Sequence, residues 1–313
     1  MRTTVAMLTF RRPGDLADAL PMLVDRVAEV EGAELLVVDN DEEPTARDAV
    51  AAWQGSVRYV HEPRPGIAAA RNRALAEATG SDVVVFVDDD ERPDPGWLGA
   101  LLDAFDAYRS ADCVAVAGPV LSVFDGPVDP WIEAGGFFTR LRHPSGARVR
   151  VAATNNLLLD LPWLRERGIT FDEQFGITGG SDTVLSLRIE QAGGVIRWCD
   201  EAVVRDVVPP SRATRSWVLR RAYRMGNTGS RAEVHVTRGL PRVRARAVMV
   251  GRGLVRVAGG GARAAWGVLT RSARHRARGV RSAVRGAGML TGAFGIVYAE
   301  YVRPAARPRA VHA

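Results

Sequence analysis

Short apolar runs alternate with amphipathic stretches through the first 120 residues of the chain. The runs are rich in Val and Leu and lie at 3–10, 33–40, 56–62 and 82–90. Continuous apolar runs of this length are typical of buried strands in a parallel sheet. Because helical patterns or turns separate the runs, the sequence predicts an α/β fold with a mostly parallel central sheet flanked by helices.

The stretches between the runs contain helix signals. After Pro13 the apolar residues recur at helical spacing, at Leu16, Leu20, Leu23, Val24 and Val27. A second helix is expected over 67–80, where Gly80 supplies the usual stop. A third is expected from about 95 to 108, with Asp94 as its N-cap.

The chain changes character twice after residue 120. The part that follows is less regular, with a further strand in 151–160 and a helix near 182–192. From Ser211 onward the patterns are helical, Arg-rich and interrupted by Gly. These changes predict a first domain with two parts and a helical extension, at about 1–120, 121–225 and 226–313.

Charge divides the chain in the same way. The net charge of +6 comes from 42 basic residues, all of them Arg, and 36 acidic ones. Residues 1–208 contain 20 Arg and 34 Asp or Glu, a net charge of −14, whereas 209–313 contain 22 Arg and only Glu233 and Glu300, a net charge of +20. A basic region of this size is attracted to polyanions.

The basic region favours a membrane surface over nucleic acid. Trp266 is the only aromatic residue in 238–285, so the stacking platform of a single-strand binder is lacking and no nucleic acid partner is expected. Apolar residues mixed with Arg suit a helix at an interface. The longest apolar stretch, 286–299, is shorter than the about 18–20 residues that span a bilayer. We therefore expect attachment to an anionic membrane face without crossing.

The start of the chain and its cysteines suggest a location. Cys113 and Cys199 lie in apolar runs, which predicts reduced thiols in the core. The opening MRTTVAMLTFRRP is too short an apolar run for a signal peptide. We therefore expect a cytoplasmic protein, peripheral to the inner face of the cell membrane.

Three consecutive carboxylates, Asp88, Asp89 and Asp90, end the fourth apolar run. Ligands of open parallel sheets bind beyond the carboxyl ends of the strands. Adjacent like charges require a cation, and oxygen ligands suit Mg²⁺ or Mn²⁺ shared with substrate phosphates. The alternative is a solvated acidic turn before the next helix.

Two further residues are weaker candidates. Asp39 ends the run LLVVDN and could accept a hydrogen bond from a base or ribose, or be a turn residue. Arg71 lies on the helix after PGI and could contact a phosphate, or be an exposed cation near Glu77. The glycines form neither GxGxxG nor GxxxxGK[ST], which removes the fingerprints of dinucleotide-binding and P-loop proteins.

The order of these pieces closely resembles family 2 of the inverting glycosyltransferases. The pieces are TFRRP at 9–13, then VVDN, PGIAAARNRAL and FVDDDE, then GGSDT at 179–183. Members of this family have the GT-A fold and use nucleotide-diphosphate sugars with a divalent metal. The resemblance covers about 1–225 and implies a catalytic domain there, with the nucleotide-binding part first and the acceptor part second.

The resemblance implies roles for individual residues. The positions that match the family's nucleotide-sugar contacts are Thr9, Arg11, Asp39, Arg71, Asp88 and Asp89. Asp88 to Asp90 match the DXD element, in which Asp88 would face the ribose and Asp90 would hold Mg²⁺ or Mn²⁺ between the donor's two phosphates.

Asp182 matches the family's catalytic base. That base follows a Gly-rich loop, commonly GGED, and here Gly179 and Gly180 precede Ser181 in place of the Glu. Inversion needs a carboxylate that takes the proton of the attacking acceptor hydroxyl. The alternative for Asp182 is the N-cap of helix 183–192.

Two further groups match the family less specifically. Asn155 and Asn156 resemble a strand that faces donor sugar and acceptor, although a structural turn is the alternative. A helix with Arg220, Arg221 and Arg224 resembles the Trp/Arg segment of exopolysaccharide-type members, such as those that build succinoglycan. Arginines four apart share a helix face and suit a pyrophosphate or an anionic lipid head, or they form an exposed cationic face.

The expected function is metal-assisted transfer from a nucleotide sugar, UDP-sugar by default, to a glycan acceptor that is lipid-linked, in exopolysaccharide or cell-surface polysaccharide biosynthesis. One alternative is a sugar nucleotidyltransferase, whose Gly-rich signature after the first strand is missing from TFRRPGDL. The other is a non-catalytic protein that binds polyanions through its basic region.

Overall fold

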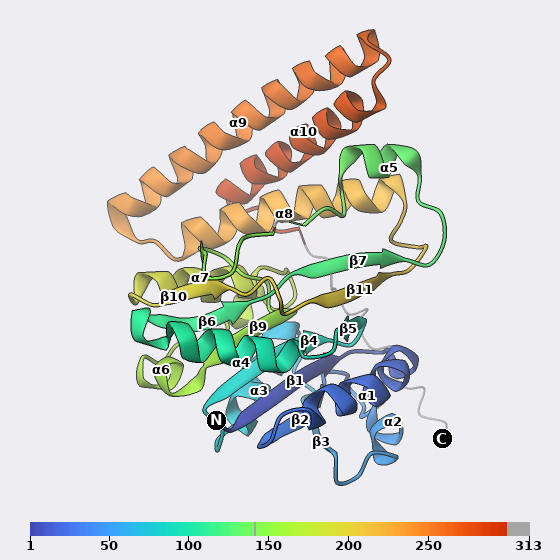
Figure 1. Ribbon diagram of the computed structural model, residues 1–313. Coiled ribbons are helices and arrows are strands. Elements are labelled where there is room, and N and C mark those ends of the chain that lie inside the picture. The colour runs from blue at the N-terminus through green and yellow to red at the C-terminus, as the bar shows by residue number, and fades with distance from the viewer. Residues whose placement is uncertain (141, 299–313) are drawn as a thin grey trace, which may run out of the picture.

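A mixed sheet of eight strands forms the centre of the molecule (Figure 1). The computed structural model describes residues 1–140 and 142–298. The strands are, in spatial order, β3 (Val57–His61), β2 (Ala33–Asp39), β1 (Thr3–Thr9), β4 (Val83–Asp88), β9 (Asn156–Asp160), β6 (Cys113–Ala117), β10 (Val195–Trp198) and β8 (Arg148–Val149). Only β9 and β8 run against the other six, which confirms the mostly parallel sheet.

Helices cover both faces of this sheet. The helices on one face are α1 (Pro13–Ala28), α2 (Arg47–Ala51) and α4 (Trp97–Tyr108), and those on the other are α3 (Ile67–Glu77), α6 (Leu161–Glu166) and α7 (Ser181–Gln191). Side chains alternate along each strand, so that Val5 and Met7 pack on the first face and Ala6 and Leu8 on the second. Both faces of the strands are therefore buried, which explains the continuous apolar runs.

Two helix boundaries differ from the prediction. The helix expected over 67–80 ends at Glu77 in α3, so Gly80 is not its stop, and the helix expected from about 95 begins later. Helix α4 begins at Trp97, after Gly96 in a left-handed conformation (φ 75°). The expectation that Asp94 caps this helix is therefore wrong, since the Asp94 carboxylate instead forms an ion pair with Arg205 at 2.7 Å. The predicted thiols Cys113 and Cys199 are buried and form no disulfide.

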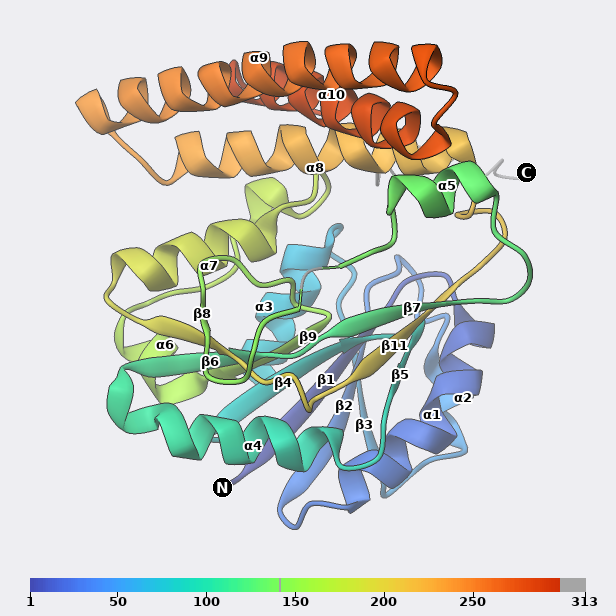
Figure 2. The same cartoon turned by 45° about the horizontal axis from the view of Figure 1, so that its top comes forward.

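A second, smaller sheet lies between the central sheet and the C-terminal helices (Figure 2). Its strands are, in order, β5 (Glu91–Pro93), β11 (Val204–Val208) and β7 (Val120–Phe124). The short helix α5 (Pro130–Gly135) and the one-turn helices η1 (Arg109–Ala111) and η2 (Glu173–Phe175) complete the domain. Strand β5 begins with Glu91, directly after the three aspartates. Its pairing with β11 therefore anchors the end of the aspartate turn in the smaller sheet.

Three long helices form a layer above the two sheets (Figures 1 and 2). They are α8 (Arg215–His235), α9 (Gly239–Leu269) and α10 (Ala273–Ala293), and α10 packs against both of the others. Glycine allows close approach along these seams, since a Cβ on Gly260 would meet the backbone of Gly279. Within residues 1–140 and 142–298, no helix is long and apolar enough to span a membrane. The end of the expected extension, 299–313, lies outside the described residues.

Candidate active site

The carboxyl ends of β1, β2 and β4 place three of the predicted residues at one edge of the sheet. In the strand register Thr9 pairs with Asp39, and Leu8 pairs with Asp88. Thr9 is buried, and its hydroxyl donates to Asp89 Oδ2 at 2.8 Å. The ends of three neighbouring strands therefore meet at the acidic cluster.

Two arginines neutralise part of this cluster. Arg12 Nη1 lies 3.2 Å from Asp89 Oδ1 and 3.0 Å from Asp90 Oδ2. Arg212, in the turn before α8, places its Nη1 2.8 Å from the same oxygen of Asp90. Asp90 is therefore held by one cation from the loop after β1 and one from the loop after β11.

Burial changes the acidity of the cluster. Burial raises the pKa of Asp88 to about 7, and the charges of Asp90 and Asp89 add to the rise while those of Arg71 and Arg140 oppose it. Burial likewise raises the pKa of Asp89 to about 6, against the charge of Arg12. Part of the cluster is therefore protonated near neutral pH when no further cation is present.

Glu91 lies directly behind the cluster. Its carboxylate accepts hydrogen bonds from the backbone N–H of Asp88 at 3.0 Å and from the side-chain amide of Asn155 at 2.5 Å. The side chain is buried, which raises the Glu91 pKa well above its usual range, and the charge of Asp88 adds to this effect. Glu91 thus holds the turn of Asp88 to Asp90 in place and connects it to Asn155.

The cluster fits a divalent cation that takes most of its ligands from a substrate. Within the part of the chain that the structure describes, no group of three or more His, Cys, Asp or Glu side chains is arranged to hold a metal ion. Both oxygens of Asp89 accept hydrogen bonds from Thr9 and Arg12. Mg²⁺ and Mn²⁺ are commonly bound by one or two carboxylates together with water and phosphate oxygens. Asp90, with 17% of its side chain exposed, suits such a site.

The two remaining predicted nucleotide residues of the first strands differ in exposure. Asp39 is fully buried and accepts from the backbone N–H of Ala46 and from the Tyr59 hydroxyl, each at 2.9 Å. Arg11 is half exposed, has a left-handed backbone (φ 55°) and pairs with Asp41 at 3.2 Å. Asp39 therefore shapes the loop after β2, whereas Arg11 is accessible to a ligand.

Arg71 connects the acidic cluster to the start of α7. Its Nη1 donates to the hydroxyl of Ser181 at 2.9 Å, and its charge acts on Asp88. Arg71 and Ser181 are both buried, with the guanidinium over the ring of Phe171. Arg71 is therefore an internal link, in contrast to the exposed cation that was the alternative.

Asp182 lies in the first turn of α7. Gly179 and Gly180 adopt left-handed conformations (φ 75° and 97°), and Gly180 is the N-cap. The Asp182 carboxylate accepts from the backbone N–H of Thr183 at 2.6 Å. Because the helix begins at Ser181, Asp182 is not its N-cap, so that alternative is wrong.

The two candidate asparagines lie in different surroundings. Asn156 is only 1% exposed, donates to the carbonyl oxygens of Pro119 and Ala202, and accepts from the Trp97 indole at 2.8 Å. Its hydrogen-bonding groups are therefore used inside the protein. Asn155 is half-buried next to Glu91.

The candidate arginines of α8 differ in exposure and surroundings. Arg220 is exposed, whereas Arg221 lies over the rings of Phe138 and Trp217. Burial lowers the pKa of Arg221 to about 10, and the positive charges of Arg140, Arg224 and Arg212 add to this. Arg221 thus belongs to a group of arginines, and in this group Arg140 is paired with Asp206 at 2.5 Å.

Several residues of this site were not predicted. They are Arg12, Glu91, Arg140, Asp206 and Arg212. Arg12 and Glu91 adjoin predicted residues in the sequence, which was the only signal for them. Asp206 is opposite Glu91 in the pairing of β11 with β5, a relation that appears only in the folded chain.

Comparison with known sequences points to one family. The family described as Glycosyl transferase family 2 matches residues 4–158. The chain is 35% identical over 242 residues to the succinoglycan biosynthesis protein ExoM of Rhizobium meliloti (strain 1021), which covers 75% of this chain and 76% of that protein. It is 29% identical over 229 residues to the pre-mycofactocin glycosyltransferase of Mycobacterium tuberculosis, covering 69% of this chain and 46% of that protein.

Two solved glycosyltransferase structures have folds similar to that of this chain. The mannosyltransferase PcManGT from Pyrobaculum calidifontis, in complex with GDP-Man and Mn²⁺, matches with a TM-score of 0.64 and 19% identity over 93% of this chain and 86% of that one. GalNAc-T7 with UDP, GalNAc and Mn²⁺ matches with a TM-score of 0.57 and 14% identity over 83% of this chain and 51% of that one. These likenesses confirm the predicted GT-A type of fold.

Proposed function

The chain belongs to glycosyl transferase family 2 and is a glycosyltransferase, and we propose that it transfers a sugar with inversion from a nucleoside-diphosphate sugar to a glycan acceptor. The observation that supports this most is the buried hydrogen bond of 2.9 Å between Arg71 and Ser181. Through this contact, the acidic cluster at the end of β4 and the first turn of α7 with Asp182 belong to one site.

Asp182 is the proposed general base. Inversion requires the acceptor hydroxyl to attack the anomeric carbon opposite the leaving diphosphate, and a carboxylate on the acceptor side to take its proton. Asp182 is half-buried and lies in the first turn of α7, which follows Gly179 and Gly180. Arg71 donates a hydrogen bond to Ser181, the residue before Asp182. We expect this contact to fix the position of the base relative to the acidic cluster.

Asp90 is the proposed ligand of Mg²⁺ or Mn²⁺. A bound divalent cation would stabilise the charge that develops on the leaving diphosphate. Arg12 and Arg212 both contact Asp90. We expect their guanidinium groups to bind the phosphates of a donor instead when one is present. Arginine forms strong charge-assisted hydrogen bonds with phosphate oxygens. The presence of Mn²⁺ in the two similar solved complexes supports this assignment.

The proposed donor contacts come from the ends of β1, β2 and β4. Arg11 is exposed enough to contact the nucleotide directly, while Thr9 and Asp39 shape the pocket from buried positions. Asp88 is the proposed ribose contact, and Asp89 holds Arg12 in place. A UDP-sugar remains the default donor, and similar enzymes are known with either UDP or GDP-Man.

The proposed acceptor is a lipid-linked saccharide of exopolysaccharide or cell-surface polysaccharide biosynthesis. The likeness to a succinoglycan biosynthesis protein supports the pathway type. Arg221, with Arg220 and Arg224 on the same helix, provides positive charge close to Asp206 and the cluster. These arginines suit the phosphates of such an acceptor, and Asn155 is the asparagine placed to contact a sugar.

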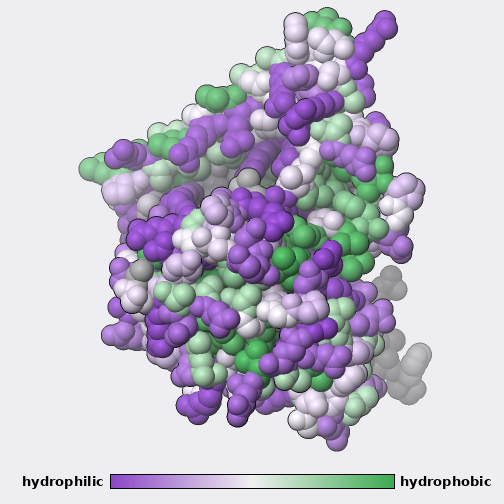
Figure 3. Space-filling model, viewed as in Figure 1, coloured by the Kyte–Doolittle hydropathy of each residue, from purple (hydrophilic) through white to green (hydrophobic). Residues whose placement is uncertain are grey.

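The C-terminal helices are proposed to attach the enzyme to the anionic inner face of the cell membrane. Helix α9 presents large apolar side chains to the outside, with Leu254 56% and Val255 73% exposed. Hydrophobic and hydrophilic residues lie side by side along this helix (Figure 3). No Asp or Glu occurs between Glu233 and Glu300, so the arginines there are not balanced by acids in the same stretch. Apolar side chains flanked by arginines favour an anionic membrane surface.

A thermal-shift panel of nucleoside diphosphates, with and without Mn²⁺, tests the proposed site. One nucleoside diphosphate should raise the melting temperature of the wild type only when Mn²⁺ is present, and Asp90→Asn should remove this effect. If none of the nucleotides stabilises the protein, a non-catalytic role in binding polyanions gains support instead.

A further inference from the structure

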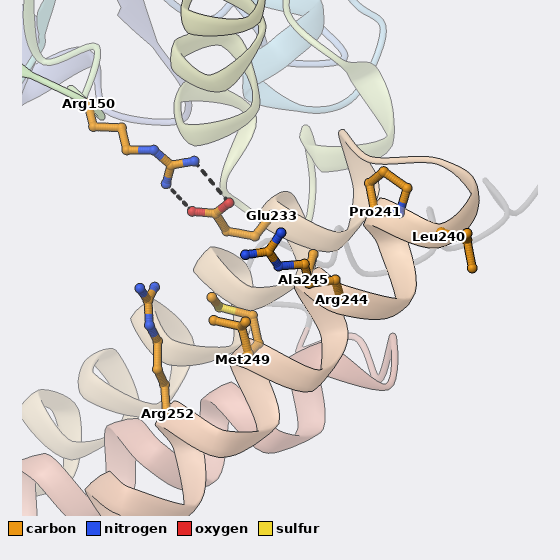
Figure 4. A pocket seen from close by; sticks show the side chains of 9 residues that line it. Arg150, Glu233, Leu240, Pro241, Arg244, Ala245, Met249 and Arg252 are labelled. Carbon is orange, nitrogen blue, oxygen red and sulfur yellow. Dashed lines mark hydrogen bonds and ion pairs between the residues drawn. The ribbon is translucent and has the colours of Figure 1, made fainter.

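A groove of about 750 Å³ lies between the end of α8 and the first half of α9 (Figure 4). The groove is lined by Arg150, which follows β8, by Glu233 of α8 and by residues within 240–252 of α9. None of the residues of the acidic cluster lines it, so the groove is a separate feature. Arg150 also pairs with Glu190 near the end of α7, at 2.9 Å. Asp182 is in the first turn of that same helix, eight residues or roughly 12 Å away along its axis.

Three guanidinium groups face this groove. Figure 4 shows Arg150, Arg244 and Arg252 around one opening, with Met249 between them. Arg150 forms an ion pair with Glu233. Within the residues that the structure describes, Arg244 and Arg252 form no ion pair with a carboxylate. The opening therefore has two uncompensated positive charges, which favours an anion.

Apolar side chains also line the groove. Met249 is buried, whereas Val248 is 40% and Leu240 is 85% exposed. Val248 and Leu240 also belong to the exposed surface of α9 that bears Leu254 and Val255. A ligand in the groove would meet apolar side chains and guanidinium groups together, and its apolar part could continue along α9.

We propose that this groove binds the phosphate headgroup of an anionic lipid, with the lipid chain against Leu240 and Val248. The proposal depends on the proposed membrane attachment for its biological context, but binding to the groove is measurable without a membrane. A free phosphate would use the guanidinium groups and leave the apolar side chains of the lining exposed. A lipid phosphate satisfies both parts, since a guanidinium binds phosphate oxygens and apolar contact stabilises the chain.

Binding of a soluble short-chain lipid tests the groove directly. The full-length protein is titrated with dihexanoyl phosphatidate, with dihexanoyl phosphatidylcholine and with inorganic phosphate, and each affinity is measured by calorimetry. We expect phosphatidate to bind most tightly. An arginine next to an anionic lipid is worth roughly fivefold in affinity, so Arg244→Gln with Arg252→Gln should weaken binding about 25-fold.

Two further double variants test the contribution of overall charge and the contribution of the lipid chain to binding. Arg263→Gln with Arg274→Gln removes the same charge at exposed positions outside the groove, and phosphatidate binding should be unchanged. Leu240→Ser with Val248→Ser should bring the affinity for phosphatidate down toward that for inorganic phosphate. The side chains changed in these two double variants are exposed on the helices, so both variants should fold like the wild type.

The proposal would be overturned by no binding of phosphatidate to the wild type, by equal affinity for inorganic phosphate, or by equal losses in the groove variant and its charge-matched control. Tighter binding of an oligonucleotide that displaces phosphatidate would also overturn it. If phosphatidate binds as expected but the protein does not sediment with vesicles of equal parts phosphatidylcholine and phosphatidylglycerol, the groove is supported and the membrane attachment fails.

Discussion

Arg212 Nη1 lies 2.8 Å from Asp90 Oδ2, and the two residues are 122 positions apart in the chain. Arg12 contacts the same carboxylate oxygen at 3.0 Å. A divalent cation on this oxygen would be repelled by both guanidinium groups, so the arginines compete with a metal ion for Asp90. In the proposed reaction, the diphosphate of a bound donor would offer the arginines a new partner.

The affinity for metal alone and for nucleotide should therefore change in opposite directions in Arg212→Gln. We expect about tenfold tighter binding of Mn²⁺ alone, because one competing cation is gone, and about tenfold weaker binding of nucleoside diphosphate with Mn²⁺. Electron paramagnetic resonance of free Mn²⁺ and calorimetry measure the two affinities. Arg205→Gln, which breaks the exposed pair with Asp94, is the matched control and should change neither affinity. An unchanged Mn²⁺ affinity in Arg212→Gln would contradict the competition.

Stability without metal should depend on pH through Asp88. The folded protein holds the Asp88 proton up to about pH 7, whereas an unfolded Asp releases it near its ordinary pKa. The folded state thus binds more protons between these values, so the free energy of unfolding falls as pH rises from about 4 to about 7 and levels off above that. Asp88→Asn removes the cost of the buried charge. Its free energy of unfolding should equal that of the wild type near pH 4, and its excess over the wild type should be at least about 2 kcal/mol larger at pH 8 than at pH 5.

Urea denaturation in the presence of a chelator measures this difference. Asp103→Asn, at an exposed position of α4, is the control and should leave the pH profile as in the wild type. Added Mn²⁺ should stabilise the wild type more at pH 8 than at pH 5, because metal binding requires ionised carboxylates. An Asp88→Asn profile parallel to that of the wild type would refute the assigned pKa shift.

Glycines in α8 should differ sharply in their tolerance of Ala. A Cβ on Gly226 would overlap the carbonyl oxygen of Arg285 in α10, whereas the space around Gly229 is open. Gly226→Ala should therefore destabilise the packing of α10 by about 2 kcal/mol or more, and Gly229→Ala should stabilise the helix by up to about 1 kcal/mol. Thermal denaturation and limited proteolysis of the C-terminal helices report the difference. Equal effects of the two substitutions would mean that α8 and α10 do not pack closely at Gly226.

The local pattern of the sequence was sufficient to predict the strands β1, β2, β3, β4 and β9, most helices and the acidic cluster. Buried strands need continuous apolar runs, and Asp88 to Asp90 end such a run, so both are visible locally. The reversed strand β9 and the smaller sheet depend on pairings between distant segments, which no local pattern contains. Residues that act through such pairings, including Glu91, Asp206 and Arg212, were missed for the same reason.

Asn156 illustrates how a correct motif can suggest the wrong environment. Its neighbour Asn155 lies in the turn before β9 and contacts Glu91 at the edge of the site, whereas Asn156 is the first residue of β9 and is 1% exposed. Its partners are the carbonyl oxygens of Pro119 and Ala202 and the Trp97 indole, from three separate segments. A sequence pattern identifies the pair of amides but does not say which of them is satisfied by the protein.

Membrane attachment should depend on the apolar side chains of α9. Val255→Glu places a charge where the proposed interface is apolar and should weaken binding to vesicles of equal parts phosphatidylcholine and phosphatidylglycerol by about tenfold. Val123→Glu, at an exposed position of β7, makes the same change elsewhere and should have no effect. Sedimentation at low salt measures both. Wild-type binding by Val255→Glu would show that this side of α9 does not contact the membrane.

The proposed transfer reaction is measured as release of nucleoside diphosphate from a nucleotide sugar, in the presence of membranes that contain lipid-linked saccharides. General base catalysis contributes about 100-fold or more, so Asp182→Asn should lower turnover by at least that factor, and EDTA should abolish it. Glu190→Gln, a matched change at the other end of α7, should retain activity. Asp182→Asn with wild-type turnover, or turnover that resists EDTA and does not need Asp90, would contradict the proposed mechanism.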